Sequence, residues 1–169
     1  MIDMSSSIRG PKMTKAFGIL VVMGVTGVLF CSSAVRGQTT VAQNWVDGWN
    51  ATDPETLVAA FTPDGVYEDV AFGITKKGSA ELRELHKFFH NAVGGLYVKL
   101  VDTHVADGHG TIEWVFGGTD VDVFKTRKPF SVRGVSVIEV SDGHISRNLD
   151  YYDSAAIMRQ VGVLPEAKK

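Results

Sequence analysis

The hydrophobic residues follow two different periods along the chain. In residues 41–61 and 79–93 they recur every three or four positions, which is the spacing of one face of an α-helix. From residue 96 to residue 152 they alternate with polar residues, as in β-strands that bury one face. Because helices come first and most strands later, the pattern predicts an α+β fold with helices packed on one face of a curved antiparallel sheet.

Four helices are expected, and several carry signals for their ends. Trp45 and Trp49 stand four residues apart, so the two indoles share a helix face. Asp53 suits the N-cap of the second helix and Pro54 its first position, and Gly94 is a suitable stop for the third. The predicted helices span residues 41–49, 53–61, 79–93 and 154–162.

Five strands are expected, of which the first is short. Turns such as "ADGHG" and "SDGH" separate the later ones, and such short links favour antiparallel neighbours. The fourth strand has one face that suits the wall of an apolar chamber with a single small polar group, Ser136. The predicted strands span residues 66–70, 96–105, 110–118, 130–140 and 145–152.

The last strand has no cleanly apolar face. Its alternation places Asn148, Asp150 and Tyr152 on one side. This side either faces water or lines a polar pocket between the sheet and the helices, a usual place for ligands, and the alternation does not decide between the two. Asp153 is expected to cap the final helix. Because the register of the last strand is open, Asp153 is also the alternative to Asp150 as the functional carboxylate.

Asp69 is the second carboxyl group with candidate chemistry. It ends the first strand and precedes Val70, Ala71 and Phe72, so its carboxylate is expected to lie against apolar surface. Burial raises the pKa of a carboxyl group and suits a general base near neutral pH. The alternative is that Asp69 only caps the loop.

Composition argues against several other functions. The 169 residues carry a net charge of -2, and no basic patch interleaved with aromatic residues indicates nucleic-acid binding. The glycines match no phosphate-binding loop, so no nucleotide is expected. His86 and His90 have the spacing of helical metal ligands, but the sequence offers no evident third ligand. A structural histidine pair is therefore favoured, and neither a metal nor another cofactor is expected.

The N-terminal segment has the layout of a secretory signal. A basic head, "IRGPKMTK", precedes a stretch without charge and then small residues. The apolar run 16–30 is shorter than the roughly 20 residues of a bilayer span. This length favours cleavage at Ala34 or Gly37 and a secreted or periplasmic protein; the alternative is a membrane anchor through residues 16–35.

One folded domain is expected after this segment. Residues 1–37 are assigned to the signal peptide or hydrophobic segment, 38–165 to the domain and 166–169 to a C-terminal tail. Cys31, the only cysteine, falls in the first part, so the domain has no disulfide and depends on its core. A chain of roughly 130 residues can form such a core.

Four stretches keep the order and spacing of a known family. They are "WVDGWNATDPETLVAAFTPDGVYED", "IEWVFGG", "FSVRGVSVIEVSDGHISRNLDYYD" and "IMRQVG". Together they resemble a SnoaL-like domain of the nuclear transport factor 2-like superfamily over residues 40–163. The resemblance implies a cone-shaped fold, in which a strongly curved antiparallel sheet with helices on its concave side encloses an apolar cavity. Relatives include ketosteroid isomerase, limonene epoxide hydrolase and polyketide cyclases, so the fold alone does not specify a reaction.

The resemblance also implies roles for single residues. Asp69 stands where ketosteroid isomerase has its catalytic base, and Asp150 matches a terminal-strand aspartate of limonene epoxide hydrolase and polyketide cyclases. The partner positions differ from those of both enzymes. Trp45 and Ser136 stand where the isomerase has its oxyanion donors, and Trp114 stands where the hydrolase has a charged residue.

Two hypotheses about function follow. In the first, an exported isomerase, cyclase or hydrolase uses Asp69 and Asp150 for acid-base chemistry on a small apolar substrate without a cofactor. The residues expected to bind that substrate are Trp45, Tyr67, Trp114, Ser136 and Tyr152. In the second, the same cavity binds a hydrophobic ligand without catalysis and the aspartates are structural. A homodimer through the outer sheet face is expected, and contact with a membrane only if the N-terminal segment stays uncleaved.

Overall fold

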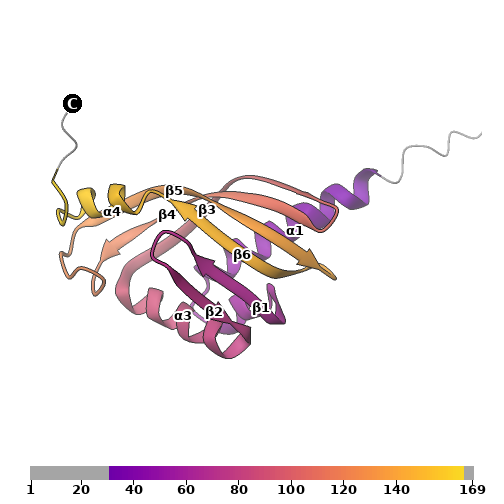
Figure 1. Ribbon diagram of the computed structural model, residues 1–169, viewed down its shortest axis with the longest axis horizontal. Coiled ribbons are helices and arrows are strands. Elements are labelled where there is room, and N and C mark those ends of the chain that lie inside the picture. Colours follow the sequence, from indigo (N-terminus) through magenta and orange to yellow (C-terminus); the bar gives the residue numbers. More distant parts are fainter. Residues whose placement is uncertain (1–30, 166–169) are drawn as a thin grey trace, which may run out of the picture.

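The computed structural model describes residues 31–165, with side chains from residue 40 onward (Figure 1). Its helices are α1 (Cys31–Asn50), α2 (Pro54–Val58), α3 (Gly78–Ala92) and α4 (Ser154–Gln160). Its strands are β1 (Phe61–Asp69), β2 (Ile74–Lys77), β3 (Val93–Ala106), β4 (His109–Asp120), β5 (Pro129–Ser141) and β6 (His144–Tyr152). The α+β class and the order of the predicted elements are confirmed.

These strands form one curved sheet that stays open, in the order β2-β1-β6-β5-β4-β3 (Figure 1). The strands β3 to β6 form consecutive antiparallel pairs, as predicted. Two of their links are two-residue turns, Asp107-Gly108 and Asp142-Gly143, and all four of these residues have a positive φ. Asp-Gly in this conformation matches the type I′ turn, whose twist suits the flanking strands and favours a hairpin.

The pairing of β1 with β6 differs from the prediction, because these two strands run parallel. The connection between them includes α3 and the strands β2 to β5, so no hairpin restricts their relative direction. The edge strand β2 is a further difference, since the sequence pattern predicts no strand there. Gly94 does not end the third helix as predicted: α3 ends at Ala92, and Gly94 lies within β3.

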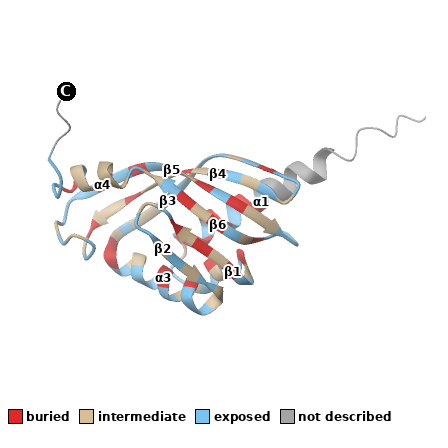
Figure 2. Cartoon of the chain, in the orientation of Figure 1, coloured by how far each residue is buried: buried red, intermediate tan, exposed pale blue. Residues whose placement is uncertain are grey.

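The helices α1 and α3 cover the concave face of the sheet (Figure 1), and the core lies between these two layers (Figure 2). Trp45 and Trp49 of α1 and Leu82 and Leu85 of α3 are buried in it. The inner face predicted for the fourth expected strand, residues 130–140, is confirmed on β5. Its buried members are Phe130, Val132, Gly134, Ser136 and Ile138.

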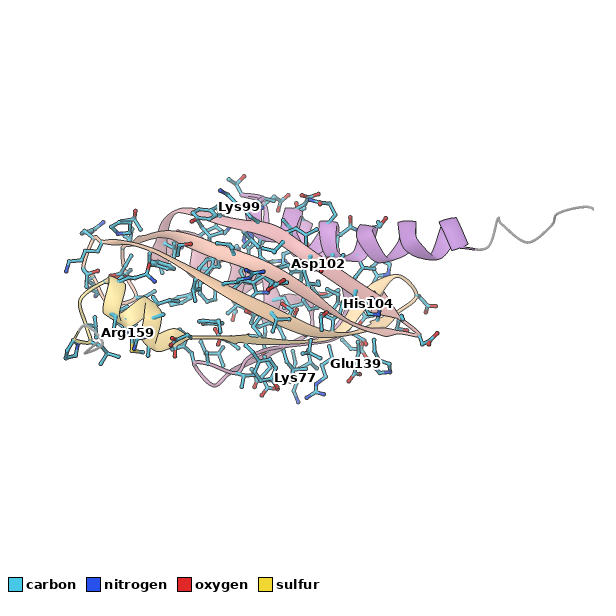
Figure 3. The ribbon with its side chains drawn as sticks, turned by 90° about the horizontal axis from the view of Figure 1, so that it is seen from above. Lys77, Lys99, Asp102, His104, Glu139 and Arg159 are labelled. Carbon is cyan, nitrogen blue, oxygen red and sulfur yellow. The ribbon has the colours of Figure 1, made fainter. Side chains whose placement is uncertain are left out.

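The two edges of the sheet carry exposed charges. Lys77 ends β2 and Lys99 lies on β3, so they stand at opposite edges (Figure 3). Charged side chains on edge strands oppose pairing with a strand of another chain. The edges are therefore poor surfaces for association by strand addition.

The predicted signal segment is 1–37 and the alternative anchor is 16–35. Residues 1–30 of these segments lie outside the described part of the chain, as does the predicted tail 166–169. Within residues 31–165, no helix combines the length and the apolar character needed to cross a membrane. The helix α1 begins at Cys31, so it includes Ala34 and Gly37, the two candidate cleavage positions.

Candidate acid-base site

Two tyrosine-aspartate pairs bridge β1 and β6 on the concave face of the sheet. Tyr67 and Asp69 are two apart on β1, as are Asp150 and Tyr152 on β6, and Asp69 lies beside Asp150 in the parallel register. Tyr67 Oη donates a hydrogen bond to Asp150 Oδ2 at 2.6 Å, and Tyr152 Oη donates to Asp69 Oδ2 at 2.7 Å. Each carboxyl group is therefore held by a tyrosine of the opposite strand.

Asp150 accepts hydrogen bonds from more side chains than Asp69 does. Its Oδ1 accepts hydrogen bonds from Ser136 Oγ and Asn148 Nδ2, both at 2.6 Å. Ser136 Oγ in turn accepts from Trp114 Nε1 at 2.8 Å. Burial raises the pKa of Asp150 to about 6, against the opposing effect of hydrogen bonds from Ser136, Tyr67 and Asn148. Asp150 therefore changes its charge close to neutral pH.

A missing side chain on β5 makes room for this network. Gly134 lies against the ring of Trp114, and a Cβ added to Gly134 would stand 2.3 Å from the ring atom Cη2. Only glycine allows the indole to approach β5 so closely that its Nε1 reaches Ser136. Gly134 thus makes room for the Trp114 indole, whose hydrogen bond to Ser136 is the first of the two that lead to Asp150.

Asp69 combines both roles that the sequence leaves open for it. Its Oδ1 accepts from the backbone N-H of Phe72 at 3.0 Å, so the carboxylate caps the turn after β1. Its Oδ2 accepts from Tyr152 in the site. Asp69 is 1% exposed, and burial raises its pKa although the hydrogen bonds from Tyr152 and from the backbone lower it.

The two carboxyl groups have no cationic partner within the described part of the chain. None of the ion pairs formed by the described residues includes Asp69 or Asp150. Burial and the nearby carboxylates raise the pKa values of Tyr67 and Tyr152, so both phenols stay protonated and act as donors at neutral pH. Two adjacent buried carboxylates without a counter-ion favour retention of a proton by the pair.

A small cavity of about 30 Å³ opens onto these groups. This volume accommodates a water molecule or a small chemical group. Its walls are mainly aromatic. The lining residues are Trp45, Trp49, Tyr67, Asp69, Phe89, Val98, Trp114, Phe116, Asp150 and Tyr152.

Most of the candidate site residues meet in this cavity. Both aspartates line it, together with Trp45, Tyr67, Trp114 and Tyr152. Ser136 does not line it: this residue is fully buried and bridges Trp114 to Asp150. The site residues absent from the sequence-based set are Trp49, Phe89, Val98, Phe116 and Asn148. The four-residue spacing from Trp45 could have identified Trp49, since both lie on one face of α1.

A second and larger chamber of about 220 Å³ adjoins the first, because Phe89, Phe116 and Tyr152 line both. Its remaining walls are almost entirely apolar. They are formed by Phe72, Ile74, Phe88, Val93, Asp120, Val123, Phe124, Phe130 and Ile157. The carboxylate of Asp120 is already used within the following loop, where it accepts hydrogen bonds from Phe124 N, Thr126 N and Thr126 Oγ1.

The paired histidines of α3 hold two helices together. Nε2 of His86 lies 3.0 Å from the carbonyl oxygen of Ala51, and Nε2 of His90 lies 3.0 Å from that of Trp49. The two imidazoles stack with their centroids 4.1 Å apart. The described residues contain no group of three or more side chains suited to hold a metal ion. These contacts agree with the structural pair favoured from the sequence.

Asp153 is placed at the start of the last helix, as predicted. Its Oδ1 accepts a hydrogen bond from the N-H of Ala156 at 2.9 Å, and its Oδ2 forms an ion pair with Arg159. Asp153 does not line either cavity. Asp150 is therefore the carboxyl group that β6 contributes to the site.

Comparison with known families agrees with this architecture. The family model of the SnoaL-like domain matches residues 42–148, which is more than half of the chain. The chain belongs to the SnoaL-like domain family. No curated protein matches the sequence of this SnoaL-like protein.

Solved structures with the fold of this SnoaL-like protein come from several bacteria. A hypothetical protein with a ketosteroid isomerase-like fold from Catenulispora acidiphila, in complex with trimethylamine, is 25% identical (TM-score 0.68), covering 76% of this chain and 97% of that one. A phenazine biosynthesis-related protein from Pseudomonas aeruginosa is 18% identical (TM-score 0.67), with 82% and 96% covered. A candidate polyketide cyclase from Bacillus cereus is 20% identical (TM-score 0.61), with 73% and 79% covered. The last two show the fold alone.

Proposed function

We propose that this SnoaL-like protein is a cofactor-independent enzyme that moves a proton on a small, mostly apolar substrate, in an isomerisation, cyclisation or hydrolysis. The observation that carries the proposal is the buried pair Asp69 and Asp150, which lines one cavity and has no cationic partner among the residues that the structure describes. An uncompensated buried charge is unfavourable for folding, and groups with strongly shifted pKa values gather at functional sites.

The protonation states of the pair suit acid-base catalysis. The pKa of Asp150 is raised to about 6 by burial, so a carboxyl group of the pair can both accept and return a proton near neutral pH. In an isomerisation, one carboxylate takes a proton from a substrate carbon and the same or the neighbouring carboxyl group returns it at another position. The reaction then balances without an oxidant, a reductant or a metal. A positioned carboxylate of this kind contributes about 10²- to 10⁴-fold to the rate.

The experiment that tests the proposal is exchange of α-protons in heavy water. Wild-type protein is incubated with 1-indanone in D₂O, and loss of the α-proton signal is followed by NMR. We expect faster exchange than in buffer alone, and a rate reduced at least about 100-fold in Asp69→Asn and in Asp150→Asn. The control is Asp64→Asn, because Asp64 is an exposed aspartate of the same strand as Asp69. Equal rates for the wild type and both site variants would refute acid-base catalysis by this pair.

A second candidate function is binding without catalysis, and the apolar chamber of about 220 Å³ favours it. In this case the aspartates serve the fold, and the chamber holds a hydrophobic molecule. Trimethylamine, which the Catenulispora relative holds, is one small probe, since aromatic walls and carboxylates both attract alkylammonium ions. Saturable binding of indane or trimethylamine, with no catalysed proton exchange in 1-indanone, would favour this function over catalysis.

We also propose that the protein is a homodimer formed by the outer face of the sheet. Val135 pairs with Tyr151, and Val137 with Leu149, across β5 and β6 on the side opposite the cavity. Val137 is 41% and Tyr151 44% exposed, so this apolar patch is available for contact. Light scattering after size exclusion is expected to give twice the chain mass. The double variant Val137→Lys/Tyr151→Lys is expected to give the chain mass, and a monomeric wild type would overturn the proposal.

Export is the remaining proposal about this protein. The basic head and the uncharged stretch that follows it are typical of a secretory signal. We expect protein recovered from the medium or the periplasm to begin shortly after Ala34 or Gly37. Intact-mass measurement decides this: recovery only with Met1 in the membrane fraction would support the anchor through residues 16–35 instead.

A further inference from the structure

Three exposed apolar side chains surround the mouth of the larger chamber. Phe72 comes from the turn after β1, Phe88 from α3 and Val123 from the loop 121–128 between β4 and β5. All three line the chamber, yet they are 38%, 49% and 38% exposed, so they stand where the chamber meets the surface. We call these three side chains the rim. Exposed apolar side chains that gather in this way mark a contact surface for a protein or a membrane.

The loop 121–128, which contributes to this rim, is basic. It contains Lys125, Arg127 and Lys128, all of them exposed. Its single exposed acidic residue is Asp122, whose carboxylate lies 3.3 Å from the ammonium group of Lys125. Arg127 and Lys128 form no ion pair with any residue that the structure describes. The loop therefore places an excess of positive charge beside the apolar rim, although the chain as a whole has a net charge of -2.

Two of these cations are held in a conformation that is unfavourable for them. Lys125 has a φ of 61° and Arg127 a φ of 58°, in the left-handed region where glycine or asparagine is usual. The buried carboxylate of Asp120 fixes this loop, because it accepts hydrogen bonds from the backbone N-H groups of Phe124 and Thr126. Strained residues of this kind persist where the surrounding structure enforces them, and they cluster at functional sites. The loop thus presents two cations where glycine or asparagine would be less strained.

An anionic bilayer is the partner that fits both features of this surface. Its phosphate groups attract lysine and arginine, and apolar side chains insert at the boundary between the headgroups and the acyl chains. The chamber of about 220 Å³ opens within the rim and has almost entirely apolar walls. A bilayer seated on the rim would continue this apolar interior, whereas a folded protein seated there would close it.

We propose that the rim of Phe72, Phe88 and Val123, together with the loop 121–128, docks the protein on an anionic lipid surface. An apolar molecule dissolved in the bilayer then reaches the chamber without crossing water. The turn after β1 and this loop lie at the end of the molecule opposite to the start of α1 (Figure 1). The docking is therefore a different contact from an anchor through the N-terminal segment, and it does not depend on acid-base catalysis.

A tryptophan placed in the rim reports the docking in the full-length chain. Phe88→Trp keeps an aromatic ring at an exposed position, and the three native tryptophans are buried, so the wild type supplies the background emission. Vesicles of brominated phosphatidylglycerol are expected to quench the additional emission and to shift it to the blue. Brominated phosphatidylcholine is expected to quench it much less. The matched control is Val101→Trp, because Val101 is 44% exposed on β3 and lines neither chamber.

Asparagine variants test the two strained cations without disturbing the loop. Asparagine tolerates the left-handed conformation, so Lys125→Asn and Arg127→Asn are expected to melt at a temperature no lower than the wild type. With Phe88→Trp as the probe, each is expected to raise the lipid concentration at half-maximal quenching about fivefold, the contribution of one cation near an anionic surface. Lys99→Asn removes an exposed cation of β3 and is expected to leave this concentration nearly unchanged. Added salt is expected to weaken the quenching.

Several results would overturn the proposal. Equal quenching of Phe88→Trp and Val101→Trp, or equal quenching by the two lipids, would show that the rim does not dock on anionic lipid. Binding to the vesicles without quenching of Phe88→Trp would show that another part of the chain makes the contact. Loss of the quenching on addition of inorganic phosphate at constant ionic strength would assign the cations to a free phosphate group. A lower melting temperature of both asparagine variants would show that Lys125 and Arg127 serve the fold. Asp150→Asn is expected to keep the quenching, so the docking and the proposed catalysis can fail separately.

Discussion

The buried charge of Asp150 makes the stability of the fold depend on pH in a way that one substitution removes. Asp150→Asn keeps the size of the side chain, and its amide can still accept from Ser136 and Asn148 through Oδ1. The new NH₂ group then faces Tyr67, whose hydroxyl can accept as well as donate. The variant therefore loses the titratable group, while the side chain at position 150 can still form hydrogen bonds with Ser136, Asn148 and Tyr67.

The expected magnitude follows from the shift in pKa. The pKa of Asp150 rises from 3.8 to about 6 on folding. A shift of about 2 units at about 1.4 kcal/mol per unit makes ionised Asp150 cost the folded state about 3 kcal/mol. Because the folded pKa is the higher one, the native state binds more protons than the unfolded chain between these values. The contribution of Asp150 to stability is thus fully present below about pH 4 and is lost as pH rises through 6.

Urea unfolding at a series of pH values between 4 and 8 measures this contribution. We subtract the free energy of unfolding of Asp150→Asn from that of the wild type at each pH. Groups that titrate alike in both proteins do not contribute to this difference. This difference is expected to fall by about 3 kcal/mol as the pH rises from 4 to 7 and then to stay level. Asp64→Asn, on the exposed surface of β1, serves as the control and should give a much flatter difference. A difference that is flat for Asp150, or that rises with pH, would refute the reasoning.

Three further changes test the surroundings of this carboxyl group. Tyr67→Phe removes a hydrogen bond that lowers the pKa of Asp150, so the fall in stability should move to higher pH in the same urea series. Gly134→Ala places a methyl group against the ring of Trp114 and should lower the free energy of unfolding by about 1–3 kcal/mol, with a matching drop in the melting temperature. Asp120→Asn replaces one of the two acceptor oxygens by an NH₂ donor, so a backbone N-H loses its acceptor. Amide hydrogen exchange should therefore speed up in residues 121–128 and remain unchanged in β5. Unaltered exchange there would show that this carboxylate does not hold the loop.

The parts of the fold that depend on local sequence could be predicted, and the part that depends on a distant partner could not. Asp-Gly at 107–108 and 142–143 favours a tight turn with positive φ whatever the rest of the chain does. The hairpins at these two places can therefore be predicted from a few residues. The direction of β1 relative to β6 is set by how α3 and the intervening strands pack, which no local pattern contains. The short strand β2 exists only because β1 offers it a free edge.

The site shows the same division between local and distant information. Alternation on β6 placed Asp150 and Tyr152 on one face, but it could not show that this polar face is the buried one. That outcome depends on β1, which brings Tyr67 to Asp150 from 83 positions away. The two motifs, Tyr-x-Asp at 67–69 and Asp-x-Tyr at 150–152, become complementary only once the strands run parallel in this register. The family resemblance supplied what alternation lacked, since it implied that the concave face encloses a cavity.

The two carboxyl groups differ in how firmly they are held, and this difference implies a division of labour. Asp150 is fixed by side chains from β1, β5 and β6, so its position is set by three strands of the sheet. Asp69 ends its strand and is held by one side chain, Tyr152, and by backbone amides of the following turn, those of Ala71 and Phe72. A general base must come within hydrogen-bond reach of the substrate proton, which a carboxylate at the end of a strand can do more readily than one fixed by three strands. We therefore infer that Asp69 removes the proton and that Asp150 sets the charge of the pair, so Asp69→Asn should slow exchange of α-protons more than Asp150→Asn. The opposite ranking of the two variants would reverse the assignment.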